Sequence, residues 1–183
     1  MIGDSLSAEY GLARQTGWVA LLQKLLDARA PGHQLVNASI SGDTTSGGLS
    51  RFAAALEKHQ PALVILELGG NDTLRGLPLA IKQSNLTRRT QMAQSKGAKV
   101  LLAGIQIPPN YWIDYALAFQ ALYPNVASQT GAGLIPFFLE GVADNMALFQ
   151  ADGIHPNELA QPIMAAHVWK YLEPMIQSAP ISK

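Results

Sequence analysis

Short apolar runs alternate with longer stretches of helical spacing along most of the chain. The runs are continuously apolar, as in Leu63-Val64-Ile65-Leu66, which indicates strands that are buried on both faces. Such alternation is typical of β-α-β units around a parallel sheet. Strands are expected in the segment that ends at Ile2 and at Gln34–Ala38, Ala62–Leu68, Lys99–Ile105 and Gly133–Pro136.

Helical spacing fills the intervals between these runs. Pro124 is expected to kink or break the fourth helix, because proline lacks the N–H that an inner turn needs. The order of elements predicts an α/β fold: a three-layer α/β/α sandwich around a flavodoxin-like, five-stranded parallel sheet in the order 2-1-3-4-5. The expected helices are Trp18–Asp27, Gly48–His59, Leu79–Lys96, Tyr111–Gln129 and Glu158–Ile176.

Neither an internal repeat nor a linker interrupts the sequence, so residues 1–183 are expected to form a single domain. A chain of this length with 48% hydrophobic residues has material for one sizeable core. Met1-Ile2-Gly3 resembles the end of a strand, and the first strand is therefore expected to be truncated at its N-terminal end.

The amino-acid composition limits the classes of partner that the protein is expected to bind. Thirteen basic residues balance 13 acidic ones, which argues against nucleic acid and favours a small-molecule substrate. No run approaches the roughly 20 apolar residues that span a bilayer, so no membrane span is expected. Cysteine is absent, which removes thiolate nucleophiles and disulfides from consideration. The protein is expected to be a monomer.

Unusual polar residues follow the predicted strands. In parallel α/β sheets, ligands bind beyond the carboxyl ends of the strands, so these segments should meet at one edge. A fourth polar segment lies late in the chain. The four are Gly3–Ser7, Ser39–Asp43, Gly69–Asp72 and Asp152–Pro156.

These segments contain the parts of a serine nucleophile system. A serine hydroxyl needs a base within hydrogen-bonding reach and a third group that orients the base. Asp152 and His155, three residues apart in a turn, can supply this pair for Ser5. The backbone N–H groups of Ser5 and Gly42 and the side-chain amide of Asn71 can serve as an oxyanion hole.

Each of these residues also has a plain structural interpretation. Ser5 is a common type of helix N-cap, and Asp152 and His155 are common in turns that lead into a helix. Asn71 can form an Asx-turn. Such roles are compatible with catalysis, and it is the combination of the four segments that favours a catalytic interpretation.

A second hypothesis for the same segments is a metal-dependent phosphoesterase. In this hypothesis, Asp4, Asp43 and Asp72 would hold two metal ions together with His155. The carboxylates lack the repeated histidine spacing that is typical of such sites, so the serine mechanism is favoured. The serine mechanism requires neither a metal nor an organic cofactor. A catalytically inactive binding module is a third reading, because fold alone does not establish an activity.

The four segments resemble the motifs of the SGNH hydrolases, also called the GDSL family, of lipases and esterases. The motifs read GDSLS, ISGD, GGND and DGIHP here, in the family's order, and they contain Ser5, Gly42, Asn71 and His155. The resemblance is closest to the bacterial multifunctional thioesterase, lysophospholipase and arylesterase subgroup. It implies the SGNH hydrolase fold and a serine esterase or thioesterase with Ser5, Asp152 and His155 as its triad.

The resemblance also implies a substrate groove. Asp4 beside the nucleophile, and Ile107, Pro108 and Tyr111 after the fourth strand, are expected to contact the substrate. Glu9 is a departure from many relatives, and a carboxylate near the site would repel anionic head groups.

The substrates implied are aryl esters, fatty acyl thioesters and lysophospholipids, and the alternative is acetylated carbohydrate. Relatives of this subgroup are often exported, which implies a periplasmic or secreted protein, with the cytoplasm as the alternative.

Overall fold

Buried aliphatic side chains alternate between the two faces of a parallel sheet in the computed structural model of the protein, which describes residues 1–47, 49–107 and 113–177. Ile65 and Leu101 point to one face, whereas Leu66 and Leu102 point to the other. This burial on both faces explains why the strands are apolar at every position. The strands, in their order across the sheet, are β1 (Ile2–Gly3), β2 (Leu63–Glu67), β3 (Lys99–Ala103) and β4 (Gly133–Ile135).

The register of the sheet aligns the ends of neighbouring strands. Gly3 of β1 pairs with Glu67 of β2, and Leu66 pairs with Leu102 of β3. All of these pairings are parallel, so the segments that follow β1 and β2 leave the sheet at the same edge. The prediction of an α/β fold around a parallel sheet is confirmed.

The predicted strand at Gln34–Ala38 is not formed as a strand, and this prediction was wrong in detail. The segment nevertheless lies beside β1 at the position predicted for it. The Met1 ammonium donates to the Val36 carbonyl at 2.8 Å, and the Ala38 N–H donates to Met1 at 3.0 Å. Because β1 has only two residues, it offers too few backbone groups for a regular ladder.

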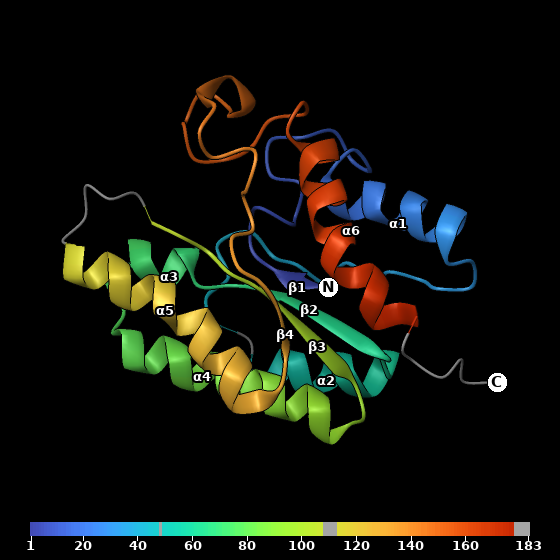
Figure 1. Ribbon diagram of the computed structural model, residues 1–183, viewed down its shortest axis with the longest axis horizontal. Coiled ribbons are helices and arrows are strands. Elements are labelled where there is room, and N and C mark those ends of the chain that lie inside the picture. The colour runs from blue at the N-terminus through green and yellow to red at the C-terminus, as the bar shows by residue number, and fades with distance from the viewer. Residues whose placement is uncertain (48, 108–112, 178–183) are drawn as a thin grey trace.

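Helices cover both faces of the sheet (Figure 1). Helices α1 and α6 pack on one face, and α2, α4 and α5 pack on the other, as the membership of the two buried clusters shows. No helix in the described ranges is both long and apolar enough to cross a membrane. The helices are α1 (Trp18–Arg29), α2 (Leu49–His59), α3 (Gly70–Leu74), α4 (Leu79–Ser95), α5 (Ile113–Thr130), the 3-10 helix η1 (Met146–Leu148) and α6 (Gln161–Gln177).

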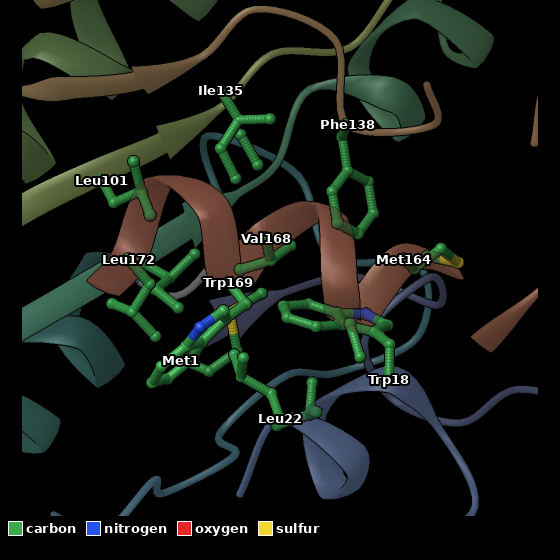
Figure 2. Close-up of a cluster of buried hydrophobic side chains, with 14 of the residues drawn as sticks. Met1, Trp18, Leu22, Leu101, Ile135, Phe138, Met164, Val168, Trp169 and Leu172 are labelled. Atoms are coloured by element: carbon green, nitrogen blue, oxygen red, sulfur yellow. The ribbon is translucent and has the colours of Figure 1, made fainter. Parts of the chain in front are cut away.

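The core on one face is the α1/α6 cluster, which includes Trp18, Leu22, Phe138 and Trp169 (Figure 2). The Trp18 and Phe138 rings meet edge to face with their centroids 5.3 Å apart. The Trp18 N–H donates to the side-chain oxygen of Gln161 at 2.9 Å, so the first turn of α1 is tied to the first turn of α6. This core thereby joins the beginning of the chain to its end.

Three local features differ from the sequence-based expectations. Helix α5 continues through Pro124 without a break, because buried neighbours such as Phe119, Leu122 and Val126 hold both of its halves against the sheet. The short helix α3 and the 3-10 helix η1 lie in segments for which no helix was predicted. Helix α3 matters for the site, because it begins at Gly70, beside Asn71.

Replacing Leu22 with alanine is expected to lower the free energy of unfolding by about 2–5 kcal/mol, because the side chain is 0% exposed and its loss leaves a cavity in the α1/α6 cluster. Urea unfolding followed by circular dichroism measures the change. Leu117→Ala is the matched control, because this leucine of α5 is 60% exposed, and it should change the free energy by less than about 0.5 kcal/mol. Equal effects of the two substitutions would contradict this packing.

Candidate active site

Ser5, His155 and Asp152 form one continuous chain of hydrogen bonds. The Ser5 Oγ lies 2.9 Å from the His155 Nε2, and the His155 Nδ1 lies 2.7 Å from the Asp152 Oδ2. Ser5 stands in the turn that follows β1, whereas the other two residues come from the loop that precedes α6. The fold thus brings together residues that are 150 positions apart in the sequence.

Backbone hydrogen bonds fix the loop that carries His155. The Asp152 Oδ1 accepts the N–H groups of Ile154 at 2.9 Å and of His155 at 3.0 Å. Gly153 adopts a φ of 67°, which a glycine takes without strain. These backbone N–H bonds, with the bond from the imidazole, lower the pKa of Asp152 to about 2. The carboxylate is therefore ionised at any pH near neutrality, and it can hold the Nδ1–H of the ring.

The Tyr10 ring packs against the imidazole of His155 in a tilted arrangement. Its ring centroid lies 4.3 Å from that of His155, with an angle of 35° between the ring planes. The Gln150 side chain holds this segment in place by donating to the Tyr10 carbonyl at 2.9 Å. Tyr10 is 50% exposed and lies outside every motif, so nothing in the sequence distinguished it from a surface tyrosine.

The three predicted oxyanion donors are arranged differently from one another. The backbone N–H groups of Ser5 and Gly42 donate to no other group of the described residues. The Asn71 Nδ2 donates one hydrogen to the Asp4 Oδ2 at 2.9 Å, which leaves its second hydrogen for a ligand. Each of the three groups therefore has an N–H hydrogen that it can donate to a ligand at this edge of the sheet.

Asp4 lies beneath Asn71 rather than on the surface. The side chain is 2% exposed, and its carboxylate accepts the N–H of Leu6 at 3.1 Å as well as the Asn71 amide. Burial raises the pKa of Asp4 to about 6, and the hydrogen bonds from Leu6 and Asn71 oppose that increase. Asp4 was expected to contact the substrate. Its buried position beside Asn71 instead lets it orient the Asn71 amide.

Charged side chains hold the loop around Gly42. Asp43 pairs with Arg51 at 2.5 Å, and Asp72 accepts both the backbone N–H of Thr45, at 2.8 Å, and its hydroxyl. Arg89, which is buried, donates to the Thr45 carbonyl at 3.3 Å. Asp43 and Asp72 thus accept hydrogen bonds from the protein. No group of three or more His, Asp or Glu residues within the described ranges is placed to hold a metal ion.

Two charged residues have partners that the sequence did not reveal. Glu9 accepts the N–H groups of Gln15 at 3.0 Å and Gly17 at 2.9 Å, so its carboxylate closes a loop instead of standing free beside the site. Arg75 donates to the Gly42 carbonyl at 2.9 Å. This bond fixes the peptide that follows Gly42.

The predicted groove residues are only partly within the described structure. Ile107 is half-buried and packs against the hydrophobic cluster under α2, α4 and α5. Pro108 and Tyr111 lie outside the described residues.

Comparisons with known proteins identify the family. The sequence pattern of the GDSL-like Lipase/Acylhydrolase family matches residues 1–161. The chain is 52% identical over 176 residues to Esterase TesA of Pseudomonas aeruginosa, covering 96% of this chain and 88% of that protein. It is 42% identical over 176 residues to Thioesterase 1/protease 1/lysophospholipase L1 of Escherichia coli, covering 96% of this chain and 83% of that protein.

Structural similarity agrees with these matches. The crystal structure of a psychrotrophic esterase, EstA, from Pseudoalteromonas sp., inhibited by monoethylphosphonate, has a TM-score of 0.91 to this protein. Its sequence is 40% identical, and the similarity covers 97% of each chain. The family resemblance of the four motifs is confirmed. The chain belongs to the GDSL-like lipase and acylhydrolase family and is a hydrolase of carboxylic esters.

Proposed function

We propose that the protein hydrolyses acyl esters and thioesters through an acyl-enzyme on Ser5, with His155 as the base and Asp152 as its orienting carboxylate. The observation that carries this proposal is the unbroken chain of hydrogen bonds, 2.9 Å from Ser5 to His155 and 2.7 Å from His155 to Asp152. A serine, a base and an orienting acid at these distances are the requirements for nucleophilic catalysis.

The reaction proceeds in two halves. The Ser5 Oγ attacks the carbonyl carbon of the substrate while its proton passes to the His155 Nε2. His155 then gives that proton to the departing alcohol or thiol as the bond between the acyl carbon and the leaving atom breaks. In the second half, a water molecule loses its proton to His155 and attacks the acyl-enzyme. The free acid leaves, and the proton returns to Ser5.

Each attack places a negative charge on the former carbonyl oxygen. The N–H groups of Ser5 and Gly42 and the second amide hydrogen of Asn71 receive this charge in the proposal. Fixed donors of this type contribute about 3–4 kcal/mol each to the stability of the transition state. Asp4 holds the Asn71 amide at 2.9 Å, so this donor is oriented before the substrate arrives. Arg75 holds the peptide that follows Gly42 through its 2.9 Å bond to the Gly42 carbonyl.

The proposed substrates are aryl esters, fatty acyl thioesters and lysophospholipids. Support comes from the relatives, one named an esterase and another named both a thioesterase and a lysophospholipase. Ile107, Pro108 and Tyr111 are proposed to contact the acyl chain. The Glu9 carboxylate is directed to its own loop, where it accepts the N–H groups of Gln15 and Gly17. We further propose a monomeric protein of the periplasm or the secreted fraction.

Ser5→Ala is expected to reduce the hydrolysis of p-nitrophenyl butyrate by at least about 10³-fold, because the nucleophile is lost while the fold is retained. Initial rates measure the loss, and circular dichroism verifies the fold. Addition of EDTA should leave the wild-type rate unchanged. A fully active Ser5→Ala variant would refute the proposal, and loss of the wild-type activity in EDTA would indicate a metal-dependent mechanism in place of the serine mechanism.

Acyl preference separates the proposed function from that of a carbohydrate acetylesterase. An apolar groove gives about 0.8 kcal/mol of binding for each buried methylene, so kcat/KM should rise along a series of acyl-CoA thioesters from acetyl to octanoyl. The same enzyme should act on acetylated xylose far more slowly than on octanoyl-CoA. The reverse order would assign the protein to the deacetylation of sugars.

Acidification should inactivate the wild-type enzyme more steeply than an Asp4→Asn variant. His155 must be neutral to accept a proton, and Asp4, with a pKa raised to about 6, must be charged to hold Asn71 most firmly. Asp152, with a pKa of about 2, does not contribute in this range.

The measurement is log kcat/KM between neutrality and the acid limit of the fold. The wild type should fall by more than about one decade per pH unit, and Asp4→Asn, from a lower starting rate, by about one decade. Parallel acid limbs in the two enzymes would contradict this role of Asp4.

A further inference from the structure

A buried carboxyl group lies directly beneath the turn that carries Ser5. Glu67, the last residue of β2, is 0% exposed. Its Oε2 accepts the backbone N–H of Asp4 at 3.2 Å and the hydroxyl of Ser7 at 2.7 Å. We call the segment Asp4–Ser7 the nucleophile loop. One carboxyl oxygen thus binds both ends of this loop, with Ser5 between them.

The strand opposite Glu67 is shaped to admit this carboxyl group. Gly3 pairs with Glu67 in the sheet, and a Cβ atom at Gly3 would lie 2.6 Å from the Glu67 Oε2 and 2.8 Å from the Ser7 Oγ. Real Cβ atoms do not approach other atoms so closely. The glycine before the nucleophile loop therefore provides the space in which Glu67 reaches it.

The surroundings favour the neutral form of Glu67. Burial, followed by the nearby carboxylate of Asp4, raises the pKa of Glu67 well above its ordinary value of 4.5. The Glu67 Oε1 is buried and has no hydrogen-bond partner among the described residues. The other titratable groups that interact with Glu67 are Asp4, from the nucleophile loop, and the buried Tyr123, from α5. Neither of these supplies a positive charge.

We propose that Glu67 is a positioning residue for ester hydrolysis: it anchors both ends of the nucleophile loop and so fixes Ser5 and, through Asp4, the Asn71 amide. This inference rests on the proposed function of Ser5. Glu67 touches neither the substrate nor the reacting atoms. Its effect is on the placement of the nucleophile and of one oxyanion donor, both of which act in the transition state. Its loss should therefore lower kcat and leave KM nearly unchanged.

Two substitutions of Glu67 distinguish its role as a hydrogen-bond acceptor from any effect of its ionisation. Glu67→Gln keeps an oxygen acceptor and is permanently neutral, whereas Glu67→Met keeps the approximate volume and removes the acceptor. A misplacement of about 1 Å costs about 100-fold in rate, so Glu67→Met should lower kcat by about 10- to 100-fold with KM changed by less than about twofold. Glu67→Gln should retain kcat within about threefold, since its amide oxygen can accept both hydrogen bonds.

Two further variants control for simple loss of packing. Ser7→Ala removes only the 2.7 Å hydrogen bond, so it should lower kcat in the same direction by a smaller factor and add little in the Glu67→Met background. It also provides the test if Glu67→Met fails to fold. Thr90→Val replaces a fully buried polar group of α4 whose hydroxyl has no partner among the described residues, and kcat should not change.

The pH dependence of stability gives a readout that does not require activity. A glutamate that keeps its proton in the folded state loses it on unfolding above pH 4.5, its ordinary pKa. The stability that this proton contributes is present at acid pH and declines as the pH rises. Above pH 4.5, the unfolding constant of the wild type should therefore increase more steeply with pH than that of Glu67→Gln. Asp4 and Tyr123 are present in both proteins, so the difference reports on Glu67 together with its interaction with Asp4.

The outcomes are distinct. Loss of kcat in Glu67→Met, its rescue in Glu67→Gln and the difference in pH slope support the inference. Full activity of Glu67→Met or Ser7→Ala overturns the positioning role of Glu67. An equal loss of kcat in Glu67→Gln and Glu67→Met overturns the conclusion that Glu67 is neutral. So does an equal pH dependence of the unfolding constants of the wild type and Glu67→Gln. Labelling of wild-type Ser5 by a fluorophosphonate keeps the two proposals apart. Absence of labelling refutes the proposed function, whereas equal labelling rates of wild type and Glu67→Met refute only the role of Glu67.

Discussion

The parallel pairing of β1 with β2 is the constraint on which the site depends. Strand β1 has two residues, and its pairing of Gly3 with Glu67 places the following turn, with Ser5, above the end of β2. The Ile40 N–H donates to the Gly3 carbonyl at 3.0 Å, so the segment that leads to Gly42 is aligned by the same short strand. One register thereby places the proposed nucleophile, Ser5, and one proposed backbone donor of the oxyanion hole, Gly42.

The second half of the site depends on packing between the ends of the chain. The Trp18 indole N–H donates to the Leu6 carbonyl at 3.0 Å, and the Trp18 backbone N–H donates to Gln161 at 2.9 Å. The Gln161 amide in turn donates to the Asn157 carbonyl at 3.0 Å, just after the loop of His155. Because the α1/α6 cluster holds these residues together, the distance between Ser5 and His155 is set by the core rather than by two free loops.

The sequence could predict those features that residue type and spacing carry. Continuous apolar runs predicted the inner strands. The order of the four motifs predicted the family, and their positions after the strands predicted that Ser5 and His155 lie at the same edge of the sheet. The roles of Glu67 and Tyr10 were not predictable, because a carboxyl in an apolar run and a tyrosine in a loop acquire meaning only from the groups that tertiary structure places beside them. The segment Gln34–Ala38 lies beside the two-residue β1 without forming a regular strand, although a short first strand was itself predicted from Met1-Ile2-Gly3.

The proposed activity requires that His155 activates Ser5 and that Ser5 faces a prepared oxyanion hole. The most direct measurement is peptide mass spectrometry of the protein after incubation with a fluorophosphonate, which reacts only where nucleophile, base and oxyanion donors act together. One adduct, on Ser5, is expected in the wild type and none in His155→Ala under the same conditions. An unlabelled Ser5, or labelling at Ser5 that persists at the wild-type rate in His155→Ala, would contradict the proposed activation of Ser5 by His155.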